Sequence, residues 1–415
     1  MAIPVPEKRI REFEELGFGM IIHWGLYAQV GLGERYREFS GVKKEDYEKL
    51  TETFTASRFD AKKIVEIAKA AGMKYIVLTS RHIDGFSLYD TKGLNEFDAP
   101  HSACGRDLIR EFVDACLEGG IKPFLYHATM DVHDPDFEND FEAYLAYLQK
   151  SVEIVCSEYK GVCGIWLDGF WAKSGADWQE DKLYGIMRKY NPDMLILNNT
   201  GVGHEGVLGH KEIDSVSFEQ MRPLRIDREG MEKYVAAEMW GTMTNDHVWG
   251  VGRQDFNYHS VPWLIETLCA CRKNGANYLL NVGPDAEGDI TMLEEAILRT
   301  IGEWISQTGD AIYKARPTDI RCEESEKNFA LAKDNKLWFY VHDIYNTFAD
   351  DAGPLPGGGA GEKIFTGVTG KIKTLRWTDN GEDIPFRQEG DKLVIECKEY
   401  VYGKNLVVRV AEAEF

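Results

Sequence analysis

A carboxylate ends one of the most apolar short runs in this chain. Gly164–Leu167 leads directly into Asp168, which is followed by a glycine and two aromatic residues. An apolar run of this length between turn residues predicts a buried parallel strand. Burying a carboxylate at the end of such a strand, beside tryptophans, is costly unless the group carries out chemistry, although an Asp could also cap the next segment. Asp168 is therefore the first candidate catalytic residue.

Other predicted strands also end on residues that can bind a ligand or transfer a proton. These strand-end residues are His23, Trp24, His82, His127 and Glu219, and Trp166 lies two residues before Asp168 in the same strand. A single histidine at a strand end is more often a hydrogen-bonded structural residue than a catalyst. In a barrel of parallel strands, however, all carboxyl ends meet on one rim, and that rim holds the active site. The whole set therefore predicts an active site there and favours a chemical role for Asp168.

Asp168 and Glu219 together suit one reaction. Retaining glycoside hydrolysis needs two carboxyl groups roughly 5–5.5 Å apart, one as nucleophile and one as acid/base. Glu219 follows an apolar stretch, and desolvation there would raise its pKa as a general acid requires, although a salt bridge to Arg222 or Arg225 is the structural alternative. Glu238 is the second candidate for the acid/base. Tryptophans could supply the apolar platform on which sugars stack: Trp24, Trp166, Trp171 and Trp249.

Eight apolar, strand-like runs alternate with amphipathic helical segments through residues 1–310. The runs are Gly19–Ile22, Tyr75–Leu78, Pro123–Tyr126, Gly164–Leu167, Met194–Leu197, Ser215–Phe218, Val235–Met239 and Tyr278–Val282. Such alternation builds a parallel sheet, and eight repeats predict an α/β fold that closes into a (β/α)8 TIM-like barrel. The fifth to seventh units contain the least helical sequence.

The sequence changes character after residue 310. Strand-like runs separated by turn residues replace the helical period, at Leu337–Val341, Lys371–Leu375, Lys392–Ile395 and Leu406–Val410. This pattern predicts a C-terminal domain over residues 311–415, formed by an antiparallel β-sandwich.

The net charge excludes some classes of partner. With a formal net charge of −21, the chain lacks the excess of Lys and Arg with which proteins bind nucleic acids and anionic membranes. A neutral ligand such as a sugar is compatible with this charge. No apolar run reaches membrane-spanning length, and the first residues do not resemble a secretory signal. We therefore expect a cytoplasmic protein, unless a signal has been removed and the protein is secreted.

The sequence indicates neither a metal site nor a cofactor. The 8 cysteines are scattered without Cys-x-x-Cys pairs, which favours a reduced compartment. A metal-dependent hydrolase would need His23, His82, His127 and Asp168 to converge through the fold, because they lack the local spacing of metal ligands. The sequence leaves the oligomeric state open, a homo-oligomer included.

Taken together, these motifs resemble glycoside hydrolase family 29, the α-L-fucosidases. Phe18–Gly25, Tyr75–Phe86 and Asn277–Pro284 are similar to the first, second and last barrel strands of that family, whose members also carry a β-sandwich. The resemblance implies a retaining exo-glycosidase that releases terminal L-fucose from oligosaccharides or glycoconjugates, with Asp168 as nucleophile and Glu219 as acid/base. The sugar contacts that it implies are His23, Glu34, His82, Trp166 and Trp249.

The departures from the family lie in the expected sugar pocket. Arg35 stands where the family usually has Trp, Ile83 where it often has a second His, and His127 where it typically has Tyr. Thr200 occupies the position of an expected sugar-binding Arg. Sites that bind a hydroxyl through hydrogen bonds discriminate strongly, so an enzyme that acts on α-L-fucosides must replace the donors lost at Ile83 and Thr200. We predict that Arg35 or His127 lines the pocket and replaces them.

Two other functions are compatible with the sequence. A hydrolase of the same fold could act on a different terminal sugar, and a catalytically weakened barrel could bind carbohydrate without cleaving it. The presence of both Asp168 and Glu219 favours an enzyme, because a binding module has no need of two strand-end carboxylates.

Overall fold

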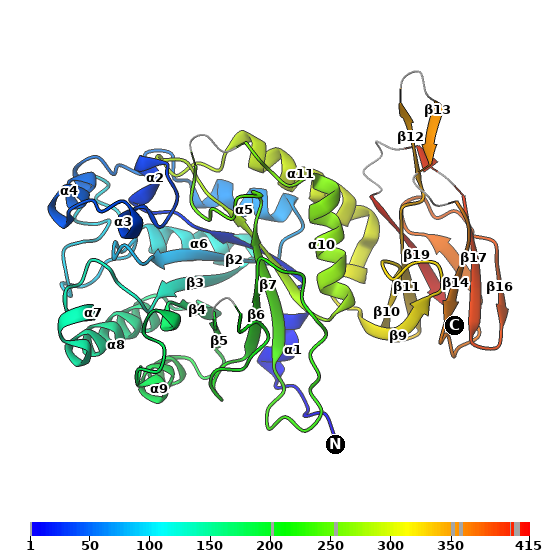
Figure 1. Ribbon diagram of the computed structural model, residues 1–415, viewed down its shortest axis with the longest axis horizontal. Coiled ribbons are helices and arrows are strands. Elements are labelled where there is room, and N and C mark those ends of the chain that lie inside the picture. Colours follow the sequence, from blue (N-terminus) through cyan, green and yellow to red (C-terminus); the bar gives the residue numbers. More distant parts are fainter. Residues whose placement is uncertain are drawn as a thin grey trace.

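The computed structural model describes residues 2–200, 203–252, 256–349, 353–356, 360–398, 400–401 and 407–415. Its first part is a closed barrel of eight parallel strands that follow one another in chain order (Figure 1). The strands are β1 Phe18–Ile22, β2 Tyr75–Arg81, β3 Lys122–Ala128, β4 Gly164–Asp168, β5 Leu195–Asn198, β6 Ser215–Glu219, β7 Ala236–Thr242 and β8 Asn277–Val282. The predicted (β/α)8 barrel is confirmed.

Long helices surround the barrel, short ones lie in the loops that follow β1, β3 and β4, and one more follows the last long helix. The long helices are α1 Lys8–Glu14, α5 Ala61–Ala70, α6 Leu108–Gly119, α8 Phe141–Glu158, α9 Glu180–Tyr190, α10 Val261–Lys273 and α11 Met292–Thr308. The short ones are α2 Tyr27–Val30, α3 Tyr36–Phe39, α4 Lys44–Glu48, η1 Lys49–Glu52, α7 Asp136–Asn139, η2 Phe170–Lys173 and η3 Gly309–Ile312. Among the described residues, β5, β6 and β7 follow one another without an intervening helix, as the weak helical pattern there predicts.

Polar N-cap residues fix where several helices begin. The Asp60 side chain accepts hydrogen bonds from the backbone N–H groups of Lys62 and Lys63 at the start of α5. Thr291 and Glu294 form a reciprocal capping box at the start of α11. Glu294 also accepts a 3.0 Å hydrogen bond from the backbone N–H of Gly283, directly after β8. The last barrel helix is thereby tied to the end of the strand that precedes it.

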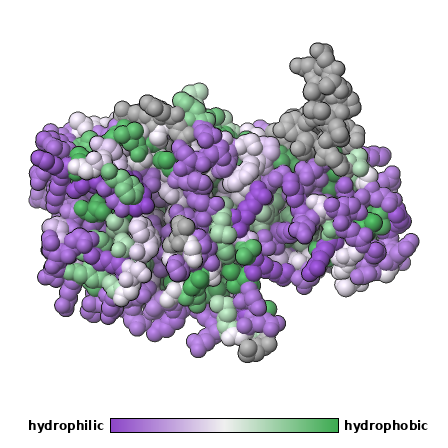
Figure 2. Space-filling model, in the orientation of Figure 1, coloured by the Kyte–Doolittle hydropathy of each residue, from purple (hydrophilic) through white to green (hydrophobic). Residues whose placement is uncertain are grey.

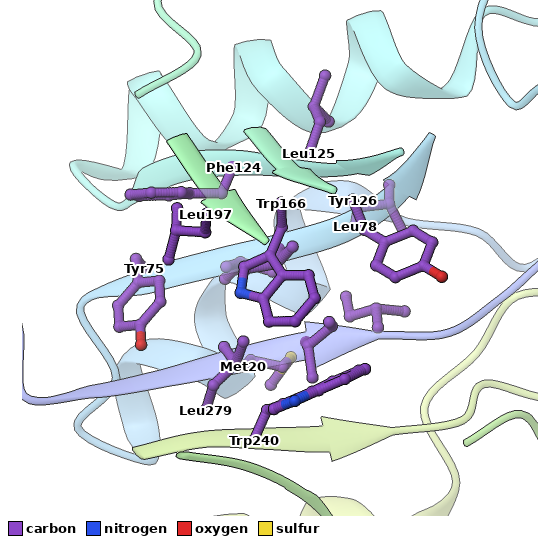
Figure 3. Close-up of a cluster of buried hydrophobic side chains, with 14 of the residues drawn as sticks. Met20, Tyr75, Leu78, Phe124, Leu125, Tyr126, Trp166, Leu197, Trp240 and Leu279 are labelled. Carbon is purple, nitrogen blue, oxygen red and sulfur yellow. The ribbon is translucent and has the colours of Figure 1, made fainter. Parts of the chain in front are cut away.

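Side chains along each barrel strand alternate between the interior and the surrounding helices. In β3, Leu125 points toward a helix whereas Tyr126 points the other way (Figure 3). Trp166 of β4 projects into the interior, where its ring centroid lies 4.5 Å from that of Trp240 in β7. Large aromatic side chains therefore fill the barrel beneath the rim on which the strands end.

Helix α11 approaches α5 so closely at Gly302 that no side chain fits between them. A Cβ atom at Gly302 would lie 1.8 Å from the carbonyl oxygen of Ala70. We expect Gly302→Ala to lower the free energy of unfolding by about 2–3 kcal/mol, because backbone atoms must move. Gly185 in α9 is the matched control, since a Cβ there meets nothing within 4 Å, and Gly185→Ala should stabilise by about 0.5–1 kcal/mol. Urea unfolding of both variants measures the difference, and equal stabilities would contradict this account of the helix contact.

After α11 the chain forms antiparallel strands. The large sheet has the order β15-β19-β11-β10-β9-β14-β17-β16, and a small one the order β13-β12-β18. The strands are β9 Arg316–Cys322, β10 Phe329–Lys333, β11 Lys336–His342, β12 Tyr345–Ala349, β13 Gly353–Pro356, β14 Gly361–Thr366, β15 Thr374–Trp377, β16 Phe386–Glu389, β17 Lys392–Cys397, β18 Tyr400–Val401 and β19 Val408–Glu414. The large sheet encloses its own core, which includes Phe339, Phe365 and Trp377. These strands confirm the predicted all-β C-terminal part.

The C-terminal strands pack on the barrel at the end farther from its short loop helices. In Figure 1, α2, α3, α4 and α7 lie at one end of the molecule and the C-terminal sheets at the other. Trp304 of α11 donates a 2.8 Å hydrogen bond to the Val408 carbonyl, and Leu331 and Tyr340 belong to the barrel's own core. This contact leaves the short helices after β1 and β3 uncovered.

Hydrophilic residues dominate the visible face of the molecule, and hydrophobic residues form smaller patches on it (Figure 2). Across the described ranges, no helix is both long enough and apolar enough to cross a membrane.

Candidate active site

A cavity of about 160 Å³ lies where the barrel strands end, and we call it the rim cavity. Its lining residues are His23, Glu34, Arg35, His82, Ile83, Asp168, Trp171, Asn199, Glu219, Trp240 and Trp249. The cavity is smaller than the roughly 300–1,000 Å³ of pockets for drug-sized ligands, and its size suits a single sugar ring. The chain thus brings most of the residues singled out from the sequence together around one small space.

Asp168, the last residue of β4, is held through both of its carboxylate oxygens. Tyr126 Oη donates to Oδ2 at 2.7 Å, and Trp171 Nε1 donates to Oδ1 at 3.0 Å. Burial raises the pKa of Asp168, and hydrogen bonds from Tyr126, Trp171 and Asn199 act in the opposite direction. These donors stabilise the charged form and fix its orientation, as a nucleophile requires.

Glu219, the last residue of β6, faces the same cavity in different surroundings. Asn199 Nδ2 donates to its Oε2 at 2.9 Å. Burial, followed by the negative charge of Asp168, raises the pKa of Glu219 to about 7. Glu219 is therefore partly protonated near neutral pH, as a general acid requires.

The salt bridge considered for Glu219 is not formed among the described residues. Arg222 donates to the Thr267 hydroxyl of α10, and Arg225 pairs with Asp319 of β9 at 2.8 Å. Both arginines therefore point toward neighbouring elements and leave the carboxyl group of Glu219 to the cavity.

Two histidines contribute neutral rings to the cavity. Asn281 Nδ2 donates to the Trp249 carbonyl, so its Oδ1 accepts the 2.7 Å hydrogen bond from His23 Nδ1. Burial lowers the pKa of His23 to about 4, and the neutral ring with its proton on Nδ1 keeps Nε2 as an acceptor. Burial also lowers the pKa of His82, whose ring stacks on Tyr126 and whose Nδ1 has no hydrogen-bond partner within the described ranges.

Glu34 connects the loop after β1 to the loop after β7. Its Oε2 accepts hydrogen bonds from the backbone N–H groups of Trp249 at 3.0 Å and Gly250 at 2.9 Å. The Trp249 ring is thereby placed on that of Trp240, with 4.2 Å between centroids and 26° between planes. These two rings and Ile83 give the cavity an apolar wall.

Two residues predicted to bind sugar, one within a strand and one just after a strand, point away from the cavity. His127 is fully buried between β3 and α8, with its two ring nitrogens bonded to Ser80 and Ser151. It shares the outward face with Leu125, because side chains alternate along a strand. Trp24 stacks on Phe59, 5.1 Å between centroids, and lies outside the cavity for the same reason. The predictions for both residues were wrong, and of the two proposed replacement donors only Arg35 lines the cavity.

Two further predicted residues lie one layer too deep. Trp166 points inward but sits beneath Asp168, and its Nε1 donates to Glu238 Oε1 at 2.8 Å. Glu238 also accepts a hydrogen bond from the Tyr75 hydroxyl and is fully enclosed by the barrel. Neither lines the rim cavity, which corrects Trp166 as a sugar contact and removes the second candidate for the acid/base.

The sequence interpretation missed three residues of the site. Tyr126 and Asn199 bond the two carboxyl groups, and Trp240 forms part of the wall. Asn199 directly follows β5, so the strand-end rule could have found it, but a neutral amide carried no other signal. Thr200, the position of the missing Arg, donates to the His204 carbonyl instead of lining the cavity.

In the described part of the chain, no three His, Cys, Asp or Glu side chains are arranged to hold a metal ion. His127 faces away from His23 and His82, so the convergence that a metal site would need is not present in this region.

A protein-family model described as alpha-L-fucosidase matches residues 5–310. The chain belongs to the α-L-fucosidase family. Among curated members, tissue alpha-L-fucosidase of Rattus norvegicus is 25% identical over 373 residues, which cover 81% of this chain and 76% of the rat protein. Tissue alpha-L-fucosidase of Bos taurus is 26% identical over 350 residues, 76% of this chain and 70% of the bovine protein. Family membership confirms the prediction of a glycoside hydrolase.

Solved structures of fucosidases share the whole fold. Alpha-L-fucosidase isoenzyme 1 from Paenibacillus thiaminolyticus has a TM-score of 0.85 at 29% identity, and the match covers 98% of each chain. An alpha-L-fucosidase from Bacteroides thetaiotaomicron, at 19% identity and a TM-score of 0.81, covers 100% of this chain and 97% of its own. The latter was trapped as a covalent intermediate with 2-fluoro-fucosyl fluoride in a Glu-to-Gln variant.

Proposed function

We propose that this protein is a retaining exo-α-L-fucosidase that forms a covalent intermediate on Asp168. The observation that carries this proposal is the contact of one amide, Asn199, with both Asp168 and Glu219. An amide that touches both groups supports the separation of about 5–5.5 Å used in retention over the 6.5–9.5 Å used in inversion. The trapped covalent intermediate of the Bacteroides relative agrees with this assignment.

In the proposed reaction, Glu219 donates its proton to the glycosidic oxygen while Asp168 attacks the anomeric carbon. The bond to the leaving group breaks, and the sugar is left covalently attached to Asp168. Glu219, now ionised, takes a proton from water, whose oxygen attacks the same carbon and releases Asp168. The raised pKa of Glu219, about 7, suits both of its roles near neutral pH.

The walls of the cavity support fucose as the sugar. L-Fucose carries a methyl group where a hexose carries a hydroxymethyl group, and Ile83, Trp240 and Trp249 form an apolar wall that suits a methyl. His23 Nε2, the His82 ring and the Arg35 guanidinium are among the polar groups available for sugar hydroxyls. A small cavity with deeply buried walls accepts one terminal residue, so we propose an exo mode of action.

The substrate assignment is tested with two substrates that differ at one position. Aryl α-L-fucoside and aryl α-L-galactoside differ only by the hydroxyl on C6, and an apolar wall should favour the fucoside by about 10–100-fold in kcat/KM. Proton NMR of the first product should show α-L-fucose, the anomer of the substrate. Preference for another sugar would indicate a glycosidase of different specificity. Sugar binding without turnover would indicate a carbohydrate-binding barrel.

A further inference from the structure

Three side chains form a stack beside the rim cavity, and we call them the Phe39 stack. The guanidinium carbon of Arg35 lies 4.5 Å from the centroid of the Phe39 ring and 5.2 Å from that of the Trp171 ring. Phe39 is 71% exposed and Trp171 is 36% exposed. Solvent therefore reaches two aromatic rings joined by one arginine.

Glu38 holds the arginine of this stack in place. Arg35 Nε and Nη2 donate to the two carboxylate oxygens of Glu38 at 2.6 and 2.7 Å. This bidentate pair fixes the plane of the guanidinium and offsets its charge. The pairing uses two of the three nitrogens, and Nη1 is left for a ligand, since no hydrogen bond from it is found within the described ranges.

The Phe39 stack leads from the reaction centre to the outside. Trp171 and Arg35 line the rim cavity together with Asp168, and Trp171 donates directly to that carboxylate. Arg35 is also close enough to Glu219 to lower its pKa. Phe39 is not among the lining residues and continues the stack into solvent. Among the lining residues, Arg35, Glu219 and Trp171 are the ones that are not buried, so the stack lies at the mouth of the cavity.

We propose that the Phe39 stack binds the leaving-group sugar, and that this sugar is a neutral pyranose. The proposal rests on the exo-glycosidase function proposed above, in which only the leaving group extends through the mouth. The C–H face of a pyranose packs on exposed aromatic rings, and a paired arginine and carboxylate bind hydroxyl groups as donor and acceptor. Glu38, Glu34 and Asp168 lie close to Arg35, so an anionic leaving group would be repelled.

The test compares substrates with and without a leaving-group ring. For an α-L-fucosyl-galactose disaccharide, Phe39→Ala should lower kcat/KM by about 3–10-fold, the loss expected for one aromatic contact. For α-L-fucosyl fluoride, whose leaving group is a single atom, kcat/KM should not change. Leu32→Ala is the matched control, because Leu32 is 67% exposed in the same loop but is not part of the stack. It should leave both substrates unaffected.

A second measurement probes the leaving-group site without hydrolysis. Titration with free lactose, followed through the indole N–H signals in NMR spectra, should show binding that is about 3–10-fold weaker in Phe39→Ala. If lactose binding depends on Phe39 but no fucoside is cleaved, the sugar site is supported and the fucosidase proposal fails. Equal losses on disaccharide and fluoride, or unchanged lactose binding, would overturn the site. A preference for sulfated or carboxylated leaving groups would overturn its assignment to a neutral sugar.

Discussion

Asp168→Ala should lose nearly all turnover, roughly four orders of magnitude in kcat, while the fold and the affinity for sugar stay largely intact. The variant removes the group that attacks the anomeric carbon, and no other carboxylate bonds to both Tyr126 and Trp171 in the described structure. Burial raises the pKa of Asp168, so ionising this carboxyl group is less favourable in the folded than in the unfolded protein, and it adds no stability at pH 7. Thermal unfolding at pH 7 should therefore show no large loss of stability.

Azide supplies a sharper test of the same role. In Asp168→Gly, azide can enter the space of the missing side chain and attack the anomeric carbon, giving a glycosyl azide of inverted configuration and partial recovery of turnover. Asp131→Asn is the matched control, because Asp131 is a buried carboxylate near the end of β3 that bonds backbone N–H groups outside the rim cavity. That variant should stay active and should not respond to azide. An Asp168 variant with more than about a tenth of the wild-type kcat would refute the assignment.

The barrel could be predicted because its strands are short apolar runs between turns. The predicted ends were less accurate where polarity rises within a strand. β2 continues through Thr79 and Ser80 to Arg81, although the apolar run stops at Leu78. These polar residues are fully buried and bond to neighbouring strands and helices, for example Ser80 to the Tyr126 carbonyl. Tertiary hydrogen bonds of this kind leave no trace in the hydropathy pattern.

The strand ends located the active site, but they did not show which side chains face it. Alternation along β3, applied from Tyr126, would have placed His127 on the helix side, and it places Leu125 there too (Figure 3). Alternation also does not show how deep in the barrel a side chain lies. Trp166 and Asp168 both point inward, but Trp166 lies one layer below Asp168. Arg35, in the loop after β1, lines the cavity beside Trp171, in the loop after β4. A contact between two loops so far apart in the chain cannot be predicted from residue spacing.

Glu219→Ala should slow substrates with poor leaving groups far more than activated ones. Loss of a general acid costs about 10²–10⁴-fold when the departing oxygen needs a proton, and little when the leaving group is fluoride or an activated aryl group. Glu238→Gln is the matched control, because Glu238 is a buried carboxylic acid on the neighbouring strand that bonds Tyr75 and Trp166 beneath the cavity. It should affect all substrates evenly or lower stability.

The pH dependence of kcat/KM separates these two carboxyl groups. Glu219 must be protonated to act as the acid, so wild-type activity should fall as the pH rises through about 7, the pKa that burial and Asp168 give it. Activity should fall at the acid side as Asp168, whose pKa is also raised, becomes protonated. Burial raises the pKa of Glu238 to about 7 as well, so the alkaline limb alone does not identify its source. Measured with an unactivated fucoside, whose leaving group needs a proton, the limb should vanish from the residual activity of Glu219→Ala and persist in Glu238→Gln. The reverse result would move the acid/base role to Glu238, despite its place below the cavity floor.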